Sequence, residues 1–183
     1  MKKMYALVIA SVAMVSSINA QDKMSLGEIT LVGGKNFSSF LYKDSGGDKD
    51  KTLDYAMYNS FGANFNFTKG KHIIRPEVMF RQAGAKSDFE GTALSWKMNY
   101  IDVNFGYLYS MLKTDKFSIS PGVAVGAGYM LNGEQYIGET RYTVSETQKL
   151  KRFDFGVQGI TNFKAYLNES FTISLEYRFG IGA

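Results

Sequence analysis

Seven segments of this 183-residue chain alternate between large apolar side chains and small or polar side chains with a period of two residues. A period of two is that of a β-strand, because successive side chains point to opposite faces. No segment after residue 20 keeps a long period of 3.6 residues, so the sequence predicts an all-β domain without helices. The seven segments are residues 26–34, 55–67, 71–83, 95–112, 117–131, 152–167 and 171–181.

The composition of the two faces indicates which solvent each face meets. One face carries large aliphatic and aromatic residues, such as Val123 and Val125, while the other carries small residues, such as Gly122 and Gly126. A soluble sheet buries its large apolar face and exposes long charged side chains, and the second face here has few of those. Small residues suit the crowded inner wall of a narrow barrel. The pattern therefore favours a transmembrane β-barrel with its apolar face in lipid over a soluble β-barrel.

The lengths of the connections support the same interpretation. Long connections at 35–54, 84–94 and 132–151 alternate with short ones at 68–70, 113–116 and 168–170. Bacterial outer-membrane barrels have short periplasmic turns, longer extracellular loops and aromatic girdles at both membrane surfaces. The mean hydropathy of -0.17 excludes a bundle of membrane-spanning helices, and the absence of cysteine excludes a disulfide framework.

The first 20 residues have the layout of a secretory signal peptide. Lys2 and Lys3 precede an apolar run at 4–15, and small or polar residues follow up to Ala20. We therefore exclude residues 1–20 from the fold and assign the barrel domain to residues 21–183. Without Lys2 and Lys3 the chain has 19 basic and 17 acidic residues, a net charge of +2. No basic tract with interleaved aromatic residues is present, so we expect no nucleic-acid partner.

Five short motifs occur in a characteristic order along the chain. They are SFGANFNFTKGKHIIRPEVMFRQAGAK (60–86), MNYIDVNFGYLY (98–109), SISPGVAVGAGYML (118–131), RFDFGVQG (152–159) and SLEYRFGIG (174–182). In this order they resemble the small outer-membrane β-barrel domain family of Bacteroidota, the PorT-type or "porin family" outer-membrane proteins. The resemblance implies an antiparallel up-and-down transmembrane barrel of eight strands located in the cell outer membrane. It says little about function, because most members have none assigned.

The number of strands departs from that family pattern. The family has eight strands, whereas the sequence shows seven segments, and the family's final strand is missing after Gly182. An odd number leaves the first and last strands unpaired, which exposes backbone polar groups to lipid at high cost. We therefore expect a chain that is truncated at its C-terminus by about one strand. Direct pairing of the first segment with the last would contradict this expectation.

Charged residues occur on the small-residue face, which is predicted to line the lumen. They comprise three arginines and four carboxylates: Arg75, Glu77, Arg81, Asp102, Asp154, Glu176 and Arg178. Buried charges must be paired, or they destabilise the protein severely. These residues predict a plug of salt bridges, because side chains fill the interior of an eight-stranded barrel. The alternative is a gated polar pathway for small solutes.

No residues are arranged for catalysis or for cofactor binding. His72 is the only histidine, and it lies beside a short turn, where we expect a solvated residue. No His, Cys or carboxylate cluster has metal-ligand spacing, and the acidic loop at 43–51 lacks the spacing of an EF-hand. The glycine-rich run in 122–131 has strand parity and precedes no helix, so it is not a dinucleotide motif. We therefore predict no catalytic residues, metal or cofactor.

Three functional interpretations follow for such a barrel. The favoured one is a non-enzymatic outer-membrane protein that contacts lipid and has a structural or interaction role. A protein partner would bind through its extracellular loops, for example in a secretion or envelope machine. The alternative is a narrow porin for small solutes, and a barrel enzyme is less favoured because no polar catalytic cluster lies at the predicted outer rim.

Overall fold

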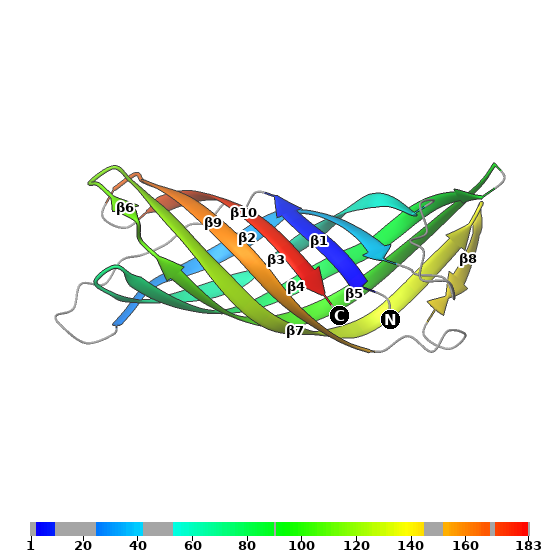
Figure 1. Cartoon of the computed structure of the whole chain (residues 1–183), viewed down its shortest axis with the longest axis horizontal. Helices are drawn as coiled ribbons and strands as arrows, with labels where there is room; N and C mark the ends of the chain where they lie inside the picture. The colour runs from blue at the N-terminus through cyan, green and yellow to red at the C-terminus, as the bar shows by residue number, and fades with distance from the viewer. Residues whose placement is uncertain are drawn as a thin grey trace.

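The chain forms a single antiparallel β-sheet (Figure 1). The computed structural model describes residues 3–9, 25–41, 53–89, 91–144, 152–168 and 171–182. The ten strands within these ranges are β1 (Lys3–Ile9), β2 (Ser25–Leu41), β3 (Leu53–Lys69), β4 (His72–Phe89), β5 (Thr92–Tyr109), β6 (Leu112–Lys113), β7 (Phe117–Ile137), β8 (Thr140–Thr143), β9 (Phe153–Tyr166) and β10 (Thr172–Gly182). The seven predicted segments correspond to β2, β3, β4, β5, β7, β9 and β10.

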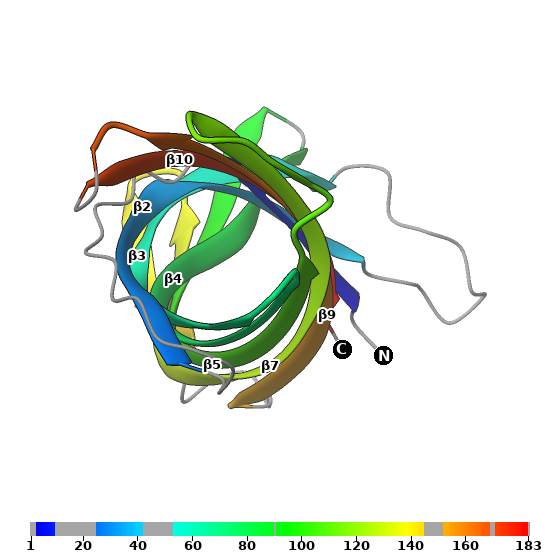
Figure 2. The ribbon, with the colours of Figure 1, turned by 90° about the vertical axis from the view of Figure 1, so that its left-hand side faces the viewer.

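Eight of these strands close the sheet into a barrel, which Figure 2 shows along its axis. The order around the ring is β2, β3, β4, β5, β7, β9, β10 and β1, with every neighbouring pair antiparallel. At the β1 seam, closure pairs the backbone of β2 over residues 35–41 and that of β10 over residues 177–182, and lipid cannot supply such hydrogen bonds. The prediction of an antiparallel up-and-down barrel of the eight-stranded type is therefore confirmed.

Strand β1 occupies the place between the first and last of the seven predicted strands. Its backbone pairs with β10 from Met4↔Gly182 to Ile9↔Tyr177 and with β2 from Lys3↔Leu41 to Ile9↔Lys35. The structure of the whole chain thus differs from the expectation that residues 1–20 take no part in the fold. The physical reason is that an added strand supplies hydrogen-bond partners to the open edges of β2 and β10, over residues 35–41 and 177–182. Cleavage after Ala20 is a processing step that stays a prediction, and so does the missing final strand.

Several strands continue beyond their predicted ends. β4 and β5 pair up to Phe89↔Thr92, so the predicted long loop at 84–94 is mainly a hairpin with a turn at Gly91. β7 likewise extends to Ile137 and turns at Gly138 into β8. Gly91 and Gly138 have φ of +79° and +56°, a region that favours glycine. The hairpins continue because their inner faces stay buried, as Ala83 and Ala85 are fully covered.

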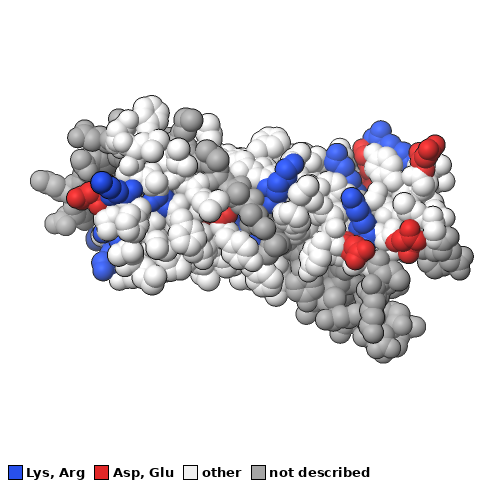
Figure 3. All heavy atoms as spheres, turned by 90° about the horizontal axis from the view of Figure 1, so that it is seen from above, with Lys and Arg blue, Asp and Glu red and all other residues white. Residues whose placement is uncertain are grey.

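The outer face of the barrel is apolar, as the alternation predicts. Figure 3 shows most of one side as uncharged atoms, with charged side chains gathered mainly toward the two ends. Among the described residues no helix is long and apolar enough to cross a membrane. Large side chains that are at least half exposed on β5, β7 and β10 include Val103, Phe105, Val123, Val125, Leu175 and Phe179.

The two ends of the barrel differ. One end, hereafter the short-turn end, carries the β3–β4 turn at Gly70 and the β5–β7 and β9–β10 connections. The opposite end carries the extended β4–β5 and β7–β8 hairpins (Figure 1).

The lipid-facing position of Pro76 on β4 interrupts the pairing with β3. The pairing is present on either side of the proline, at Asn64↔Glu77 and at Phe67↔Ile74. Proline has no backbone N–H for the ladder, so this interruption is expected.

Candidate functional site

Four charged residues form one ion-pair cluster across the middle of the lumen. Arg75 and Glu77 lie on β4 and Glu176 and Arg178 on β10, four strands away around the ring in either direction. Alternate residues of each strand point inward, so both pairs share the lumen, where each is at most 4% exposed. Strands on opposite walls are therefore joined across the full width of the barrel.

The contacts within this mid-lumen cluster are dense. Arg178 donates from Nη1 and Nη2 to the two carboxylate oxygens of Glu77, each at 2.5 Å, and from Nε to Glu176 Oε1 at 2.5 Å. Arg75 Nη1 pairs with the other oxygen of Glu176. Such bidentate, charge-assisted bonds are among the stronger hydrogen bonds in proteins.

Three asparagines supply the remaining hydrogen bonds of the cluster. Asn66 Oδ1 accepts from Arg75 Nε at 2.8 Å. Asn104 Nδ2 donates to Glu77 at 3.0 Å, and Asn162 Nδ2 donates to Glu176 at 3.0 Å. Buried charges are tolerated when their hydrogen-bonding capacity is met in this way. Asn66 is buried on the inner face of β3, and its role as an amide partner follows only from the three-dimensional pairing.

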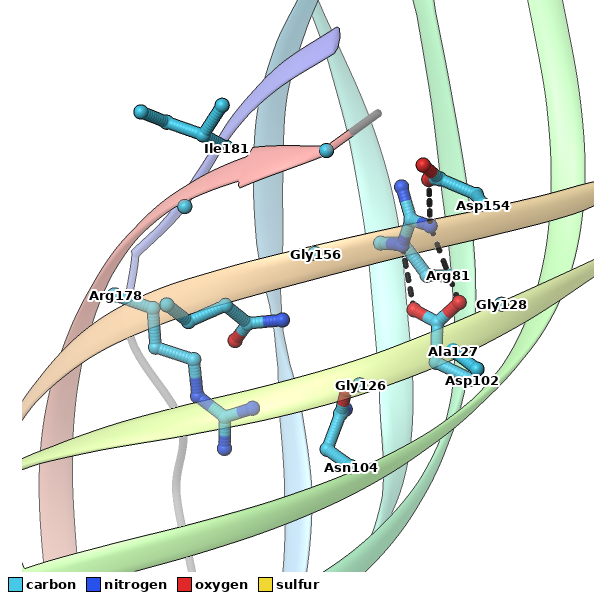
Figure 4. A pocket seen from close by; sticks show the side chains of 13 residues that line it. Arg81, Asp102, Asn104, Gly126, Ala127, Gly128, Asp154, Gly156, Arg178 and Ile181 are labelled. Atoms are coloured by element: carbon cyan, nitrogen blue, oxygen red, sulfur yellow. Dashed lines mark hydrogen bonds and ion pairs between the residues drawn. The ribbon is translucent and has the colours of Figure 1, made fainter. Parts of the chain in front are cut away.

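A second cluster lies nearer the hairpin end and joins β4, β5 and β9 (Figure 4). Arg81 donates from Nε and Nη2 to Asp102, at 2.5 and 3.1 Å, and from Nη2 to Asp154 at 3.0 Å. The guanidinium also lies over the ring of Tyr100, 4.5 Å from its centroid, which is a cation–π contact. The structure thus brings all seven charged residues singled out from the sequence into two lumenal clusters.

Glycines on β7 make room for these side chains. A Cβ on Gly128 would lie 2.4 Å from Asp102 Oδ1, and a Cβ on Gly126 would lie 1.8 Å from Asn104 Oδ1. Both distances are far below van der Waals contact. The glycine-rich run in β7 is therefore the wall against which the charge network of β5 packs.

A third ion pair was missed by the sequence reasoning. Lys164 on β9 pairs with Glu28 on β2 toward the short-turn end, and Glu28 also accepts a hydrogen bond from Thr30 at 3.2 Å. The sequence contains the information needed to place Lys164 in the lumen, because Lys164 and Asp154 are an even number of residues apart on β9 and so share the same face. With this pair, the described residues form ion pairs at three levels along the axis of the lumen.

A small cavity lies between the two larger clusters (Figure 4). Its volume is about 40 Å³, which fits a few water molecules but not a sugar or an amino acid. Gln158 Oε1 is buried beside it without a hydrogen-bond partner among the described residues. The lining residues include Arg81, Asp102, Asn104, Asp154, Gln158 and Arg178, together with glycines of β7, β9 and β10.

Two further predictions concern His72 and metal binding. His72 is exposed at the short-turn end, and its Nδ1 lies 2.7 Å from the hydroxyl of Tyr107. No group of three or more His, Cys, Asp or Glu able to hold a metal ion occurs in the part of the chain that the structure describes. The acidic loop at 43–51 lies outside the described residues.

Comparisons with known proteins identify a family for this chain and a few similar solved structures. The family model described as "Outer membrane protein beta-barrel domain" matches residues 19–183. Among solved structures, Ail, the attachment invasion locus protein of Yersinia pestis, is 11% identical, with a TM-score of 0.34, covering 99% of this chain and 96% of that one. CdiB from Acinetobacter baumannii is 14% identical, with a TM-score of 0.35; the match covers 100% of this chain but 32% of CdiB. No curated protein sequence matches. The chain belongs to the outer membrane protein beta-barrel domain family, and it is a protein of the outer membrane.

Proposed function

We propose that this protein is a closed, non-enzymatic barrel that acts through its extracellular end as a structural or interaction protein. The observation that carries this proposal is the set of ion pairs that joins β4 to β10 across the lumen. Because these pairs come from opposite walls, a solute cannot pass without separating them. Partners can therefore bind the outer surface or the extracellular end of the barrel, while the closed lumen provides no open passage.

The energy of the network favours a closed lumen. Breaking one buried, hydrogen-bonded ion pair costs about 3–5 kcal/mol, and each 1.4 kcal/mol is about a factor of ten in population. Separating only the Arg178–Glu77 pair would therefore leave an open state at or below about one part in a hundred. A second pair, Arg75–Glu176, must separate at the same level.

An interaction role is supported by the strands that continue past the membrane-sized part of the barrel. The β4–β5 hairpin and the β7–β8 hairpin extend at the end opposite the short turns. Exposed ends of a rigid scaffold are where binding functions concentrate. The resemblance of the motifs to PorT-type barrels of Bacteroidota supports an accessory role in a secretion or envelope machine.

A narrow porin is the second candidate, and one observation favours it. The cavity of about 40 Å³ is lined by charged groups, including Arg81, Asp154 and Arg178, as a polar pathway would be. Its size requires the ion pairs to move before a solute larger than water could pass.

Conductance in planar bilayers separates these two candidates. The purified protein is expected to give no discrete conductance steps. A variant with Arg75, Glu77, Glu176 and Arg178 all replaced by alanine serves as the matched control, because it removes the mid-lumen cluster that joins β4 to β10, and it is expected to conduct more often than the unaltered protein. Discrete steps from the unaltered protein, at the same frequency as from this variant, would establish the porin instead.

A further inference from the structure

Three amide side chains form a hydrogen-bonded row on the outside of the barrel. Gln82 on β4, Asn99 on β5 and Asn132 on β7 are directly opposite one another in the strand register. Gln82 Nε2 donates to Asn99 Oδ1 at 3.1 Å, and Asn99 Nδ2 donates to Asn132 Oδ1 at 2.5 Å. They face outward, since their neighbours Arg81 and Tyr100 point into the lumen. We call these three residues the amide row.

The amide row divides the outer face of these strands into two parts. Toward the short turns, the next outward residues are apolar, namely Phe80 and Ile101. Away from the short turns, outward positions carry charges, such as Lys86 and Lys97. Such a change from apolar to polar is what a membrane surface imposes on a barrel.

The lengths of the strands agree with this boundary. From His72 to Gln82, β4 has 82 − 72 + 1 = 11 residues, and from Asn99 to Tyr109, β5 has 109 − 99 + 1 = 11 residues. A tilted strand needs about 9–11 residues to cross the bilayer core. Each strand has 18 residues in all, so seven residues of each extend past the amide row.

Positive charge accompanies the amide row. Arg152 immediately precedes β9 and contacts β7 close to Asn132: its backbone oxygen accepts from Met130 N at 2.7 Å, and its Nη1 donates to Tyr129 Oη at 3.2 Å. Lys97 lies two residues past Asn99, directly opposite Glu134 on β7.

The nearby carboxylate cancels only part of this charge. Glu134 is engaged by Tyr136 and Arg141, and the hydrogen bond from Tyr136 lowers the pKa of Glu134 below its ordinary value. The local charge of Lys97, Arg141, Arg152 and Glu134 at neutral pH is therefore 3 − 1 = +2.

We propose that the amide row, together with Arg152 and Lys97, is a binding surface for the phosphate groups of outer-leaflet lipid headgroups. The cations attract the phosphate, and amide N–H groups donate to its oxygens. The apolar side chains below the row, such as Phe80, contact the acyl chains of the same lipid. The occupant is lipid because one surface offers both kinds of contact along the same strands. The outer leaflet is the relevant one because short turns face the periplasm in barrels of this kind.

The depth of the boundary can be measured with one tryptophan placed on the outer face of β5. The single tryptophan of the chain, Trp96, has the inward parity of Tyr100, so it is replaced by phenylalanine and the probe is placed at the outward position of Lys97, two residues past Asn99. In phosphatidylcholine vesicles with brominated acyl chains, the fluorescence of this Lys97→Trp/Trp96→Phe variant is expected to be quenched weakly. A Phe105→Trp/Trp96→Phe variant, with the probe in the apolar part, is expected to be quenched several times more strongly. Equal quenching of the two proteins would overturn the assigned boundary.

The choice of ligand requires a second measurement. Three samples of phosphatidylcholine vesicles are compared. The first contains bis-phosphorylated lipid A, the second contains dephosphorylated lipid A, and the third contains no lipid A but has inorganic phosphate added to the buffer. Phosphorylated lipid A is expected to raise the unfolding temperature of the protein by a few degrees, read from heat-modifiable electrophoretic mobility. The other two additions are expected to leave it unchanged. An equal rise with the dephosphorylated lipid or with free phosphate would overturn the proposal.

A pair of matched variants tests the residues. The Lys97→Gln/Arg152→Gln variant is expected to lose at least half of the rise caused by phosphorylated lipid A. The Lys113→Gln/Lys116→Gln variant removes the same charge from the short-turn end and is expected to keep the full rise. If both double variants keep it, these cations do not bind the headgroup and the assignment is wrong.

Discussion

Arg178 and Glu77 meet across the barrel from opposite walls, through two parallel N–H···O bonds of 2.5 Å each. The two residues are 101 positions apart in the sequence, and their strands, β10 and β4, are separated by half of the ring in space. The same arginine also binds Glu176 of its own strand, so it connects two carboxylates. The stability of the barrel and the closure of its lumen therefore depend on the same contacts.

The single substitution Arg178→Met should destabilise the protein strongly. It leaves Glu77 buried, charged and unpaired, and breaking such a pair from one side costs about 3–5 kcal/mol. The double substitution Arg178→Met/Glu77→Met removes both charges and should recover a large part of that loss. The free energy of unfolding would be measured by urea titration in vesicles.

The control for this cycle is the exposed pair Arg141–Glu134, with the Arg141 side chain 62% exposed. Arg141→Met should change the free energy of unfolding by about 0–1 kcal/mol, as solvated pairs do. If Arg178→Met costs no more than Arg141→Met, the lumenal network does not stabilise the barrel.

Gly128→Ala should disturb the second cluster, since its Cβ would approach Asp102 Oδ1 to 2.4 Å. Overpacking of this kind costs about 1–3 kcal/mol. Gly33→Ala is the matched control, because Gly33 is exposed on β2 and a Cβ there meets nothing within 4 Å. Unfolding in urea should separate the two variants. Equal stability of the two would show that Asp102 moves aside without loss.

Much of this architecture follows from the alternation of side chains between the two faces of each strand. Because successive strand residues face opposite sides, the sequence alone places Arg75, Arg81 and Asp102 in the lumen and Phe105 in lipid. The structure agrees for each of them. The identity of the partners does not follow from parity, since the pairing of Arg178 with Glu77 depends on the stagger of the strands around the ring.

The extended hairpins could not be read from the same pattern. Past Gln82 the strand β4 continues through Ala83, Gly84 and Ala85, which are small on both faces and show no alternation. What keeps them in the sheet is packing against β5 and the hydrogen bonds between Ser38 Oγ and the backbone of Gly84. These contacts are long-range and leave no local signal. The pairing of β1 with β2 and β10 is of the same kind.

Removal of residues 1–20 is a prediction with a direct measurement. The signal-peptide layout predicts that protein purified from the outer membrane begins at Gln21. Its intact mass should then lack the residues that form β1. A mass that includes them would show that β1 persists and that residues 1–20 are not a cleaved signal.

The orientation of the barrel can be tested with single cysteines, because the chain has none of its own. Thr92→Cys places a thiol at the tip of the β4–β5 hairpin, and Lys71→Cys places one at the β3–β4 turn; both positions are exposed. A membrane-impermeant maleimide added to intact cells should label the cysteine at position 92 and not the one at position 71. After the outer membrane is opened, both should be labelled. Labelling of position 71 alone on intact cells would reverse the orientation and place the extended hairpins in the periplasm, where no extracellular partner could reach them.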